Sequence, residues 1–161
     1  MLDPQNPPAP VRDFINAAVK ADFDTMFRQV DWQASRAAQW AQNIDSPHLP
    51  EDRAPQMIAQ GFREFEDISP RMLQSKLGEI AIHIGLGGRL RGATDEERDR
   101  VVAALAVPEV KRELPDKITV RLEEWRQRAA TVTEVWAAVT DRHTYWLALG
   151  RDGKQILLAD I

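Results

Sequence analysis

The stretch YWLALGRDGKQILLADI, residues 145–161, decides the fold, because it has the pattern of two strands joined by a tight turn. Asp152 and Gly153 stand between two apolar runs, and this pair favours the positive φ angles that a two-residue hairpin turn requires. A turn centred on the pair places Leu149 opposite Ile156. The sequence therefore predicts an antiparallel hairpin at this end of the chain.

The same register places Leu147 opposite Leu158 and Tyr145 opposite Asp160. Residues 156–158 are all apolar, whereas a strand with one face in water alternates apolar and polar residues. We therefore expect the sheet to be covered on both faces.

Composition and charge limit the class of protein. The chain has 161 residues, of which 43% are hydrophobic and 29% charged, as expected of one compact domain. Its net charge of −4 favours neither nucleic acid nor an anionic membrane as a partner, and without cysteine it has no disulfide or thiolate chemistry. No apolar run is long enough to span a membrane, and no signal peptide is visible. We expect a cytoplasmic protein without membrane insertion, although an exported domain lacking its leader would look the same.

Helical periodicity dominates the first two thirds of the chain. Residues 1–10 hold four prolines and are expected to form a disordered lead, followed by a single domain over residues 11–161. The helical pattern is interrupted just before Asp22, which can cap a second helix. Further on, Thr94 and Glu97 have capping-box spacing and predict another helix start.

The region that begins at Lys117 is ambiguous between helix and strand. Ile118 and Leu122 alternate with polar residues as in a strand, but they also keep helical spacing with Trp125 and Ala129. β-branched residues on either side favour strands, and we expect strands from here to the C-terminus.

Two stretches resemble the NTF2-like (cystatin-like α+β) superfamily. PVRDFINAAVKADFDTMFRQV, residues 10–30, is similar to its two opening helices and the break between them, with Ala21 where such sequences often have glycine. RAATVTEVWAAVTDRHTYWLALGRDGKQILLADI, residues 128–161, is similar to its last three strands. The resemblance implies a curved sheet wrapped around helices as a cone with a pocket, and often a dimer through the sheet face. It implies no single function, because the superfamily includes isomerases, dehydratases and binding proteins.

In such a cone, six residues would line the pocket and take an apolar small molecule. They are Phe14, Ile15, Ala18, Phe27, Val135 and Leu147. Trp136 and Trp146 would both lie on the outer face of the sheet, because each alternates with the apolar stripe of its strand. We expect this face to be either a homodimer interface or a surface covered by a helix from the middle of the chain.

The alternative is catalysis of the isomerase type, which needs a carboxylate base beside an apolar pocket and a hydrogen-bond donor. Tyr145, the only tyrosine, would be the donor, and Asp31, Glu134 and Asp160 are the candidate bases. Asp160 is the expected cross-strand neighbour of Tyr145. A hydrogen bond between the two would serve catalysis or would merely satisfy both groups at the sheet edge.

The run IAIHIGLGGRLRG, residues 80–92, is superficially similar to a dinucleotide fingerprint. Leu90 stands where the third glycine belongs, however, and no βαβ unit surrounds the run. We therefore expect no cofactor and a flexible linker from Gly85 to Gly92. The alternative is that Arg89 and Arg91 hold an anion beside the following helix start.

The three histidines do not stand at metal-ligand spacing from one another. We also expect no carboxylate at the interval that would complete a helix-borne site, and therefore no metal. His83 lies in an apolar run and is expected in the core, His48 in a solvated loop, and His143 in a turn between strands.

These observations predict an α+β fold in which helices pack on a curved antiparallel sheet, with an enlarged helical middle. The expected function is that of a non-catalytic module that binds an apolar small molecule or a protein partner, as a homodimer. The alternative is a small isomerase or dehydratase that uses Asp31 or Asp160 with Tyr145.

Overall fold

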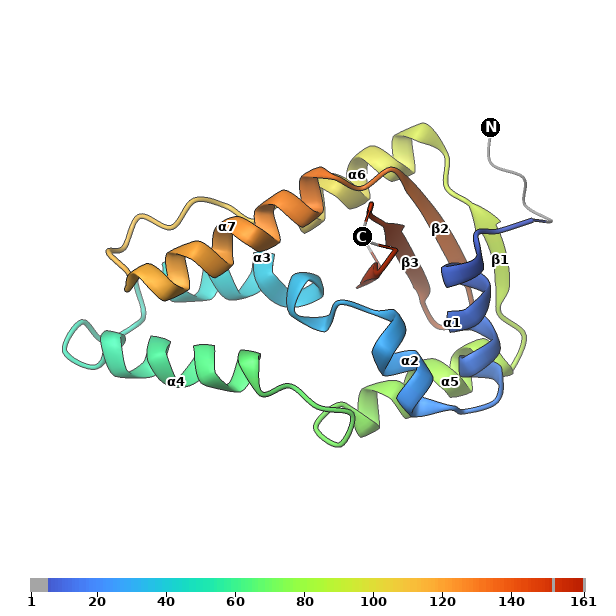
Figure 1. Ribbon diagram of the computed structural model, residues 1–161, viewed down its shortest axis with the longest axis horizontal. Helices are drawn as coiled ribbons and strands as arrows, with labels where there is room; N and C mark the ends of the chain where they lie inside the picture. The colour runs from blue at the N-terminus through green and yellow to red at the C-terminus, as the bar shows by residue number, and fades with distance from the viewer. Residues whose placement is uncertain (1–5, 152, 161) are drawn as a thin grey trace.

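The computed structural model describes residues 6–151 and 153–160. Within these ranges the chain forms seven helices and a four-stranded antiparallel sheet, which is an α+β fold with helices packed on a sheet (Figure 1). The helices are α1 (Ala9–Val19), α2 (Phe23–Gln29), α3 (Trp32–Ile44), α4 (Ala54–Glu66), α5 (Gln74–Gly85), α6 (Asp95–Leu105) and α7 (Asp116–Ala130). The strands are β1 (Arg89–Gly92), β2 (Glu134–Val139), β3 (Thr144–Leu149) and β4 (Gln155–Ala159), in spatial order β1-β2-β3-β4. None of the described helices is long and apolar enough to cross a membrane.

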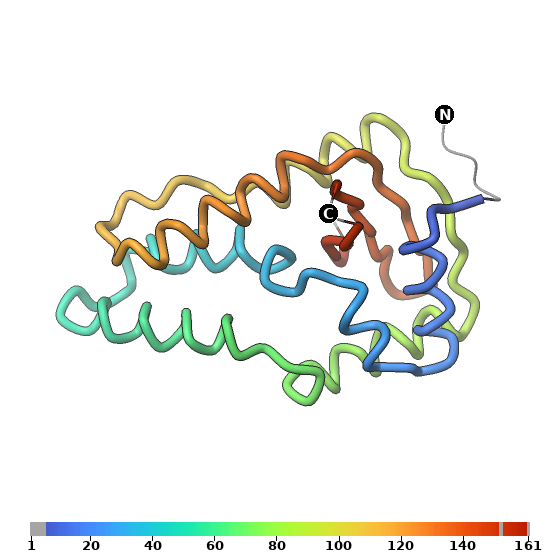
Figure 2. Tube along the Cα trace, in the orientation of Figure 1, coloured from blue at the N-terminus to red at the C-terminus, as the bar shows by residue number. Residues whose placement is uncertain are grey.

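Both faces of the sheet are covered by helices, as the apolar last strand predicts. One face packs its Tyr145 and Leu147 into a core shared with α1 and α5. The other face packs Ala137 and Ala148 into a second core that continues through α3, α4, α6 and α7. Figure 2 shows α3, α4 and α7 extending well beyond the sheet, so the second core has a purely helical end.

The two tryptophans expected on one outer face lie on opposite faces. The β2–β3 pairing places Trp136 opposite Leu147 and Ala137 opposite Trp146, so the two indoles point into different cores. The pairing joins even-numbered residues of β2 to odd-numbered residues of β3, so the two tryptophans point to opposite faces of the sheet. The alternation of apolar residues within each strand does not define this register. Trp136 is 1% exposed and Trp146 4%, both buried by helices of their own chain, so neither is available for the expected homodimer interface.

Strands β3 and β4 form an antiparallel pair, but their register differs by one residue from the expected one. Leu149 lies opposite Gln155 instead of Ile156. The connection spans residues 150–154, longer than a two-residue turn, and this extra length moves the partner positions. Asp152, the first residue of the expected turn, lies outside the described residues.

The outer edge of β4 is covered by the start of α3. Val30 forms a parallel bridge with Gln155, and the Asp31 N–H donates to the Gln155 carbonyl at 2.7 Å. The Gln155 side-chain Nε2 donates to the Pro10 carbonyl at 2.6 Å, so this buried residue connects the first helix to the last strand. An edge covered in this way offers few free backbone groups to another strand.

The first of the expected C-terminal strands is instead helix α7. Its buried residues are Ile118, Leu122, Trp125 and Ala129. They follow the helical spacing, while Val120, which strand alternation would bury with Ile118, is 56% exposed. Pro115 occupies the N-cap of α7, where its missing N–H costs no helical hydrogen bond. The helical period therefore outweighs the β propensity of the flanking residues.

At the N-terminus, α1 and α2 form as expected, and Asp22 caps α2 by accepting from the Thr25 N–H. Helix α1 begins at Ala9, so the last two residues of the expected disordered lead are helical. Proline in the first turn of a helix has the φ angle that the helix needs, which explains why Pro10 is no obstacle. Residues 1–5 of the lead lie outside the described residues.

The expected linker is partly a strand, because β1 pairs with β2 and closes one edge of the sheet. Both guanidinium NH groups of Arg91 donate to the Glu97 carboxylate at 2.8 Å. Glu97 also accepts from the Thr94 N–H and so completes the predicted capping box. Glu97 therefore already partners Arg91 and the start of α6, two of the groups that the alternative of an anion site would use.

Candidate functional site

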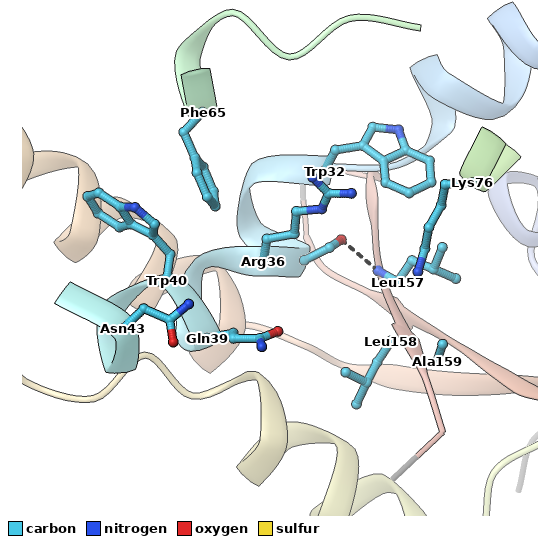
Figure 3. Close-up of a pocket in the computed structure, with 11 residues that line it drawn as sticks. Trp32, Arg36, Gln39, Trp40, Asn43, Phe65, Lys76, Leu157, Leu158 and Ala159 are labelled. Carbon is cyan, nitrogen blue, oxygen red and sulfur yellow. Dashed lines mark hydrogen bonds between the residues drawn. The ribbon is translucent and has the colours of Figure 1, made fainter. Parts of the chain in front are cut away.

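A groove runs along the outer edge of β4, between α3 and the ends of α4 and α5 (Figure 3). Its volume is about 490 Å³, which suits a small molecule. The lining residues are Trp32, Ser35, Arg36, Gln39, Trp40 and Asn43 of α3, Phe65 of α4, Lys76 of α5, and Leu157, Leu158 and Ala159 of β4.

Helix α3 contributes most of the groove because one of its faces carries residues at helical spacing from Trp32 to Asn43. Asp31 fixes the start of the helix by accepting from the Ala34 N–H at 3.0 Å. The Trp32 indole is held by a hydrogen bond from Nε1 to the Phe27 carbonyl at 3.0 Å. Trp32 is therefore held in place at the end of the groove next to α2.

Strand β4 presents backbone groups to the groove. The Leu157 N–H points outward and donates to Ser35 Oγ at 2.9 Å, while the Asp160 N–H points inward to the Thr144 carbonyl. Because every second residue of a strand directs its N–H and C=O to the same side, the N–H of Ala159 faces the groove. The groove thus combines indole and phenyl rings with backbone hydrogen-bonding groups.

The charges of the groove have one sign. Arg36 and Lys76 are cationic, and none of the lining residues is acidic, although the whole chain has a net charge of −4. Figure 3 shows the Arg36 guanidinium between Phe65 and Trp32, with the Lys76 side chain beyond the indole. Such a site attracts an anionic group and provides aromatic surface beside it.

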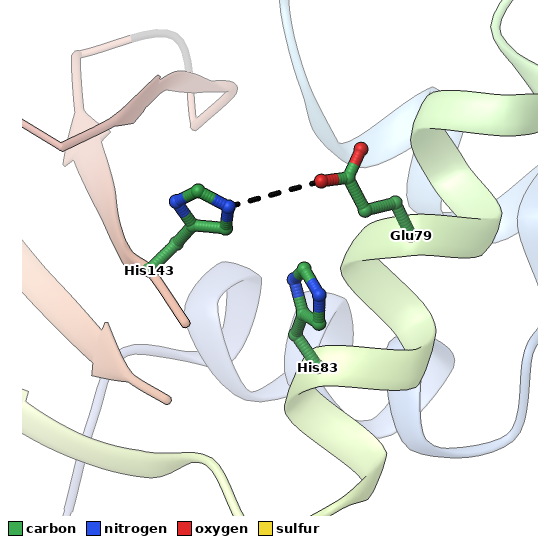
Figure 4. Close-up of side chains that lie close together, drawn as sticks. All are labelled: Glu79, His83 and His143. Carbon is green, nitrogen blue, oxygen red and sulfur yellow. Dashed lines mark ion pairs between the residues drawn. The ribbon is translucent and has the colours of Figure 1, made fainter. Parts of the chain in front are cut away.

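A second group of side chains lies where α5, the β2–β3 turn and the end of β4 meet. Nδ1 of His143 is 2.6 Å from Asp160 Oδ2, and Nδ1 of His83 is 2.7 Å from the Tyr145 hydroxyl. Glu79 Oε1 lies 3.8 Å from Nε2 of His143. Figure 4 shows Glu79 and His83 on one side of α5 with His143 facing them.

The surroundings of this group shift two pKa values. Burial raises the pKa of Tyr145 to about 12, and the negative charges of Glu79 and Asp160 act in the same direction. The pKa of Asp160 is lowered, first by the hydrogen bond from the Thr144 N–H and then by the one with His143. Tyr145 is therefore a neutral phenol and Asp160 a carboxylate at neutral pH.

The candidate catalytic residues are only partly brought together. Tyr145 lies opposite Ala159, not Asp160, so the expected cross-strand pair does not form. The two residues instead meet the histidines of the same cluster. Asp31 is elsewhere, where it caps α3 and pairs with Arg128.

The third candidate base, Glu134, accepts a hydrogen bond from Trp136 Nε1 at 3.1 Å. It belongs neither to the groove nor to the histidine cluster. Of the three candidate bases, Asp31 does line a pocket with Phe27 and Val30, but there it is paired with Arg128 and lies apart from Tyr145.

The residues expected to line an apolar cone do not line one cavity. Five of them belong to one packed core layer: Phe14, Ile15, Ala18, Phe27 and Leu147. Val135 lies on the opposite face of the sheet, in the other core. The groove lies at the β4 edge instead, where the sequence gives no local signal, because its residues come from four separate elements.

One feature of the histidine cluster was visible in the sequence. Glu79 stands four residues before His83, which is one helical turn, so the expectation that no carboxylate stands at a suitable interval is wrong. His83 is half-buried rather than enclosed in the core, and His143 lies in the expected turn between strands. His48 is exposed in the loop after α3, as expected.

Comparisons with known proteins leave the fold and these two sites as the basis for any functional conclusion. No protein-family model matches the chain, and neither the curated proteins nor the solved structures gave a match. The resemblance to the NTF2-like superfamily stays a prediction.

Proposed function

We propose that this chain is a non-catalytic binding module, and that the groove beside β4 takes a small molecule with an anionic group on an aromatic or apolar body. The observation that carries the proposal is the one-sided charge of the groove. Arg36 and Lys76 approach it from different helices, and no acidic residue lines it. A ligand anion bound there would receive charge-assisted hydrogen bonds, each stabilising by roughly 1.5–3 kcal/mol.

The aromatic residues support the second half of the proposal. Trp32, Trp40 and Phe65 offer ring surface to the same space. Trp40 and Phe65 also pack on Trp125 of α7, with ring centroids at 6.1 and 5.4 Å, so these rings are held by the core. A pre-positioned aromatic wall loses little side-chain entropy when a flat ligand binds.

The test compares two dyes of similar shape and different charge, the anionic 8-anilinonaphthalene-1-sulfonate and the neutral N-phenyl-1-naphthylamine. Fluorescence titration of the full chain should give saturable binding of the anionic dye, with weaker binding of the neutral one. The double variant Arg36→Gln/Lys76→Gln should lower the affinity for the anionic dye by roughly tenfold or more and leave the affinity for the neutral dye nearly unchanged.

The matched control is Arg12→Gln/Lys20→Gln, which removes the same two charges from exposed positions at α1. It should leave both affinities as in the wild type. Equal loss in the two double variants would show that only net charge matters, and the groove would then not be the site. Carrying out all titrations with a chelator present keeps metal ions out of the result.

A further inference from the structure

Glu79, His83 and His143 have the chemistry and the spacing of a metal-ligand set. One ligand atom from each lies within 4.8 Å of the other two, although His143 is sixty residues away from His83 in the sequence. Tetrahedral coordination with bonds of about 2.1 Å separates neighbouring ligand atoms by about 3.4 Å. The 3.8 Å between Glu79 Oε1 and His143 Nε2 is close to this value, so these two ligands need only a small side-chain adjustment.

Both imidazole rings are held at Nδ1, and Nε2 of His143 faces Glu79. His143 bonds to the Asp160 carboxylate and His83 to the Tyr145 hydroxyl, at 2.6 and 2.7 Å. Metal-binding histidines are typically oriented by such an outer partner, which fixes the tautomer and raises the basicity of the other nitrogen. Tyr145 is 2% exposed, so its hydroxyl is a fixed part of the scaffold.

The backbone around His143 and Asp160 is also fixed. Asp160 has a φ of 54°, an unfavourable value for a residue with a side chain, and its carboxylate accepts from the Thr144 N–H at 3.0 Å. Thr140 ties the turn by accepting from the His143 N–H at 3.0 Å and donating to the His143 carbonyl at 2.7 Å. The structure therefore maintains local backbone strain at the point where the Asp160 carboxylate meets His143.

We propose that Glu79, His83 and His143 bind one divalent transition-metal ion of the Zn²⁺ class, with Asp160 and Tyr145 as positioning residues. Two imidazole nitrogens and one carboxylate suit Zn²⁺ and its neighbours in the first row, and disfavour Mg²⁺ and Ca²⁺, which prefer oxygen ligands. Glu79 and His143 are partly exposed, so a fourth coordination position faces solvent.

The experiment titrates the metal-free full chain with Zn²⁺ by calorimetry and with Co²⁺ by visible spectroscopy. We expect one ion per chain, Co²⁺ ligand-field bands typical of low coordination number, and no competition from Mg²⁺. Nitrogen NMR should show metal at Nε2 and a proton at Nδ1 of His143, and metal at one ring nitrogen of His83. Glu79→Gln and His143→Ala should each lower the affinity for Zn²⁺ by roughly a hundredfold or more.

The positioning residues separate a built site from casual binding by surface histidines. Asp160→Asn and Tyr145→Phe should each lower the affinity for Zn²⁺ by roughly 10–100-fold, while the chain still binds one ion. Asp160 is exposed, so this variant decides the question even if Tyr145→Phe disturbs the core. The matched control, His48→Ala/Glu51→Gln, removes an exposed histidine and glutamate from a loop and should have no effect.

Two results would overturn the proposal. One is wild-type Zn²⁺ affinity no higher than that of Glu79→Gln/His143→Ala with circular dichroism unchanged. The other is undiminished affinity in Asp160→Asn, which would assign the binding to adventitious contacts. Neither result depends on the dye experiments, because the groove variants keep all five residues of the cluster.

Discussion

Ala21 shows how a single residue sets the joint between two helices. Its N–H donates to the Ala18 carbonyl at 3.1 Å, and the next N–H, of Asp22, donates to the Ala17 carbonyl at 2.8 Å. These two bonds form a Schellman motif, whose central residue must be left-handed, and Ala21 accordingly has a φ of 55°. Asp22 then caps α2, so one pair of residues ends α1 and begins the next helix.

Replacing Ala21 with glycine should stabilise the protein. Alanine pays about 1–2 kcal/mol for the left-handed conformation, and glycine avoids this cost while losing some backbone entropy on folding. We expect Ala21→Gly to raise the free energy of unfolding by about 0.5–1 kcal/mol in urea denaturation. Ala103→Gly, at an exposed position within α6, should lower it by about 1 kcal/mol. Destabilisation by both changes would contradict the left-handed geometry at Ala21.

Glu97 makes stability depend on pH at the acid end. The pKa of Glu97 falls from its ordinary value of 4.5 to about 2, first because Arg91 donates two hydrogen bonds to it. A carboxylate with a lowered pKa stabilises the folded state above pH 4.5, and this contribution disappears as the pH falls towards 2. Solvent reaches Arg91, which reduces the effect to about 1–2 kcal/mol.

Denaturation curves between pH 2 and 7 test this. The wild type should lose stability more steeply than Glu97→Gln as the pH falls from 4.5 to 2, and the two curves should converge at the acid end. Glu96→Gln, at the exposed neighbouring position, should run parallel to the wild type. Parallel curves for Glu97→Gln and wild type would contradict the assigned ion pair.

At the scale of elements, α7 is the segment that the sequence allows to be either a helix or a strand, and the two alternatives bury different residues. In a strand, Ile118 and Val120 would share the buried face. In α7, Ile118 is 3% exposed and Val120 56%. Ile118→Ala should therefore cost about 2–4 kcal/mol of unfolding free energy, and Val120→Ala should be neutral or slightly stabilising, since alanine favours a helix. Equal losses of unfolding free energy at the two positions would support a strand instead of a helix.

The elements also show why some predictions from the sequence are confirmed and others are wrong. Asp22, Thr94 and Glu97 act within four residues of their partners, so their roles follow from spacing alone. The pattern at α7 fits both helix and strand, and the packing of Trp125 on Trp40 and Phe65 that accompanies the helix involves residues far away in the sequence. The β3–β4 register depends on the length of a loop, which apolar patterning does not define.

At the scale of the whole molecule, the candidate sites are assembled from distant segments. Of the metal-ligand set, only the Glu79–His83 pair is a local pattern; His143 joins it because β2 and β3 place their turn against α5. The groove likewise needs α3 and β4 side by side, and the Leu157 N–H joins them by donating to Ser35 Oγ. Coverage of both sheet faces was predictable, because residues 156–158 are consecutive apolar residues within one strand.

The position of Gln155 has a consequence for the order of events during synthesis. This residue joins α1 through Pro10 and α3 through Asp31, yet it follows both by more than a hundred residues. A nascent chain that has produced every other described element still lacks β4, so both of its apolar layers remain incomplete and open to water. Contacts of such long sequence separation form slowly and leave hydrophobic surface exposed meanwhile. We expect the unfinished chain to depend on chaperones until β4 leaves the ribosome and closes both layers in one step.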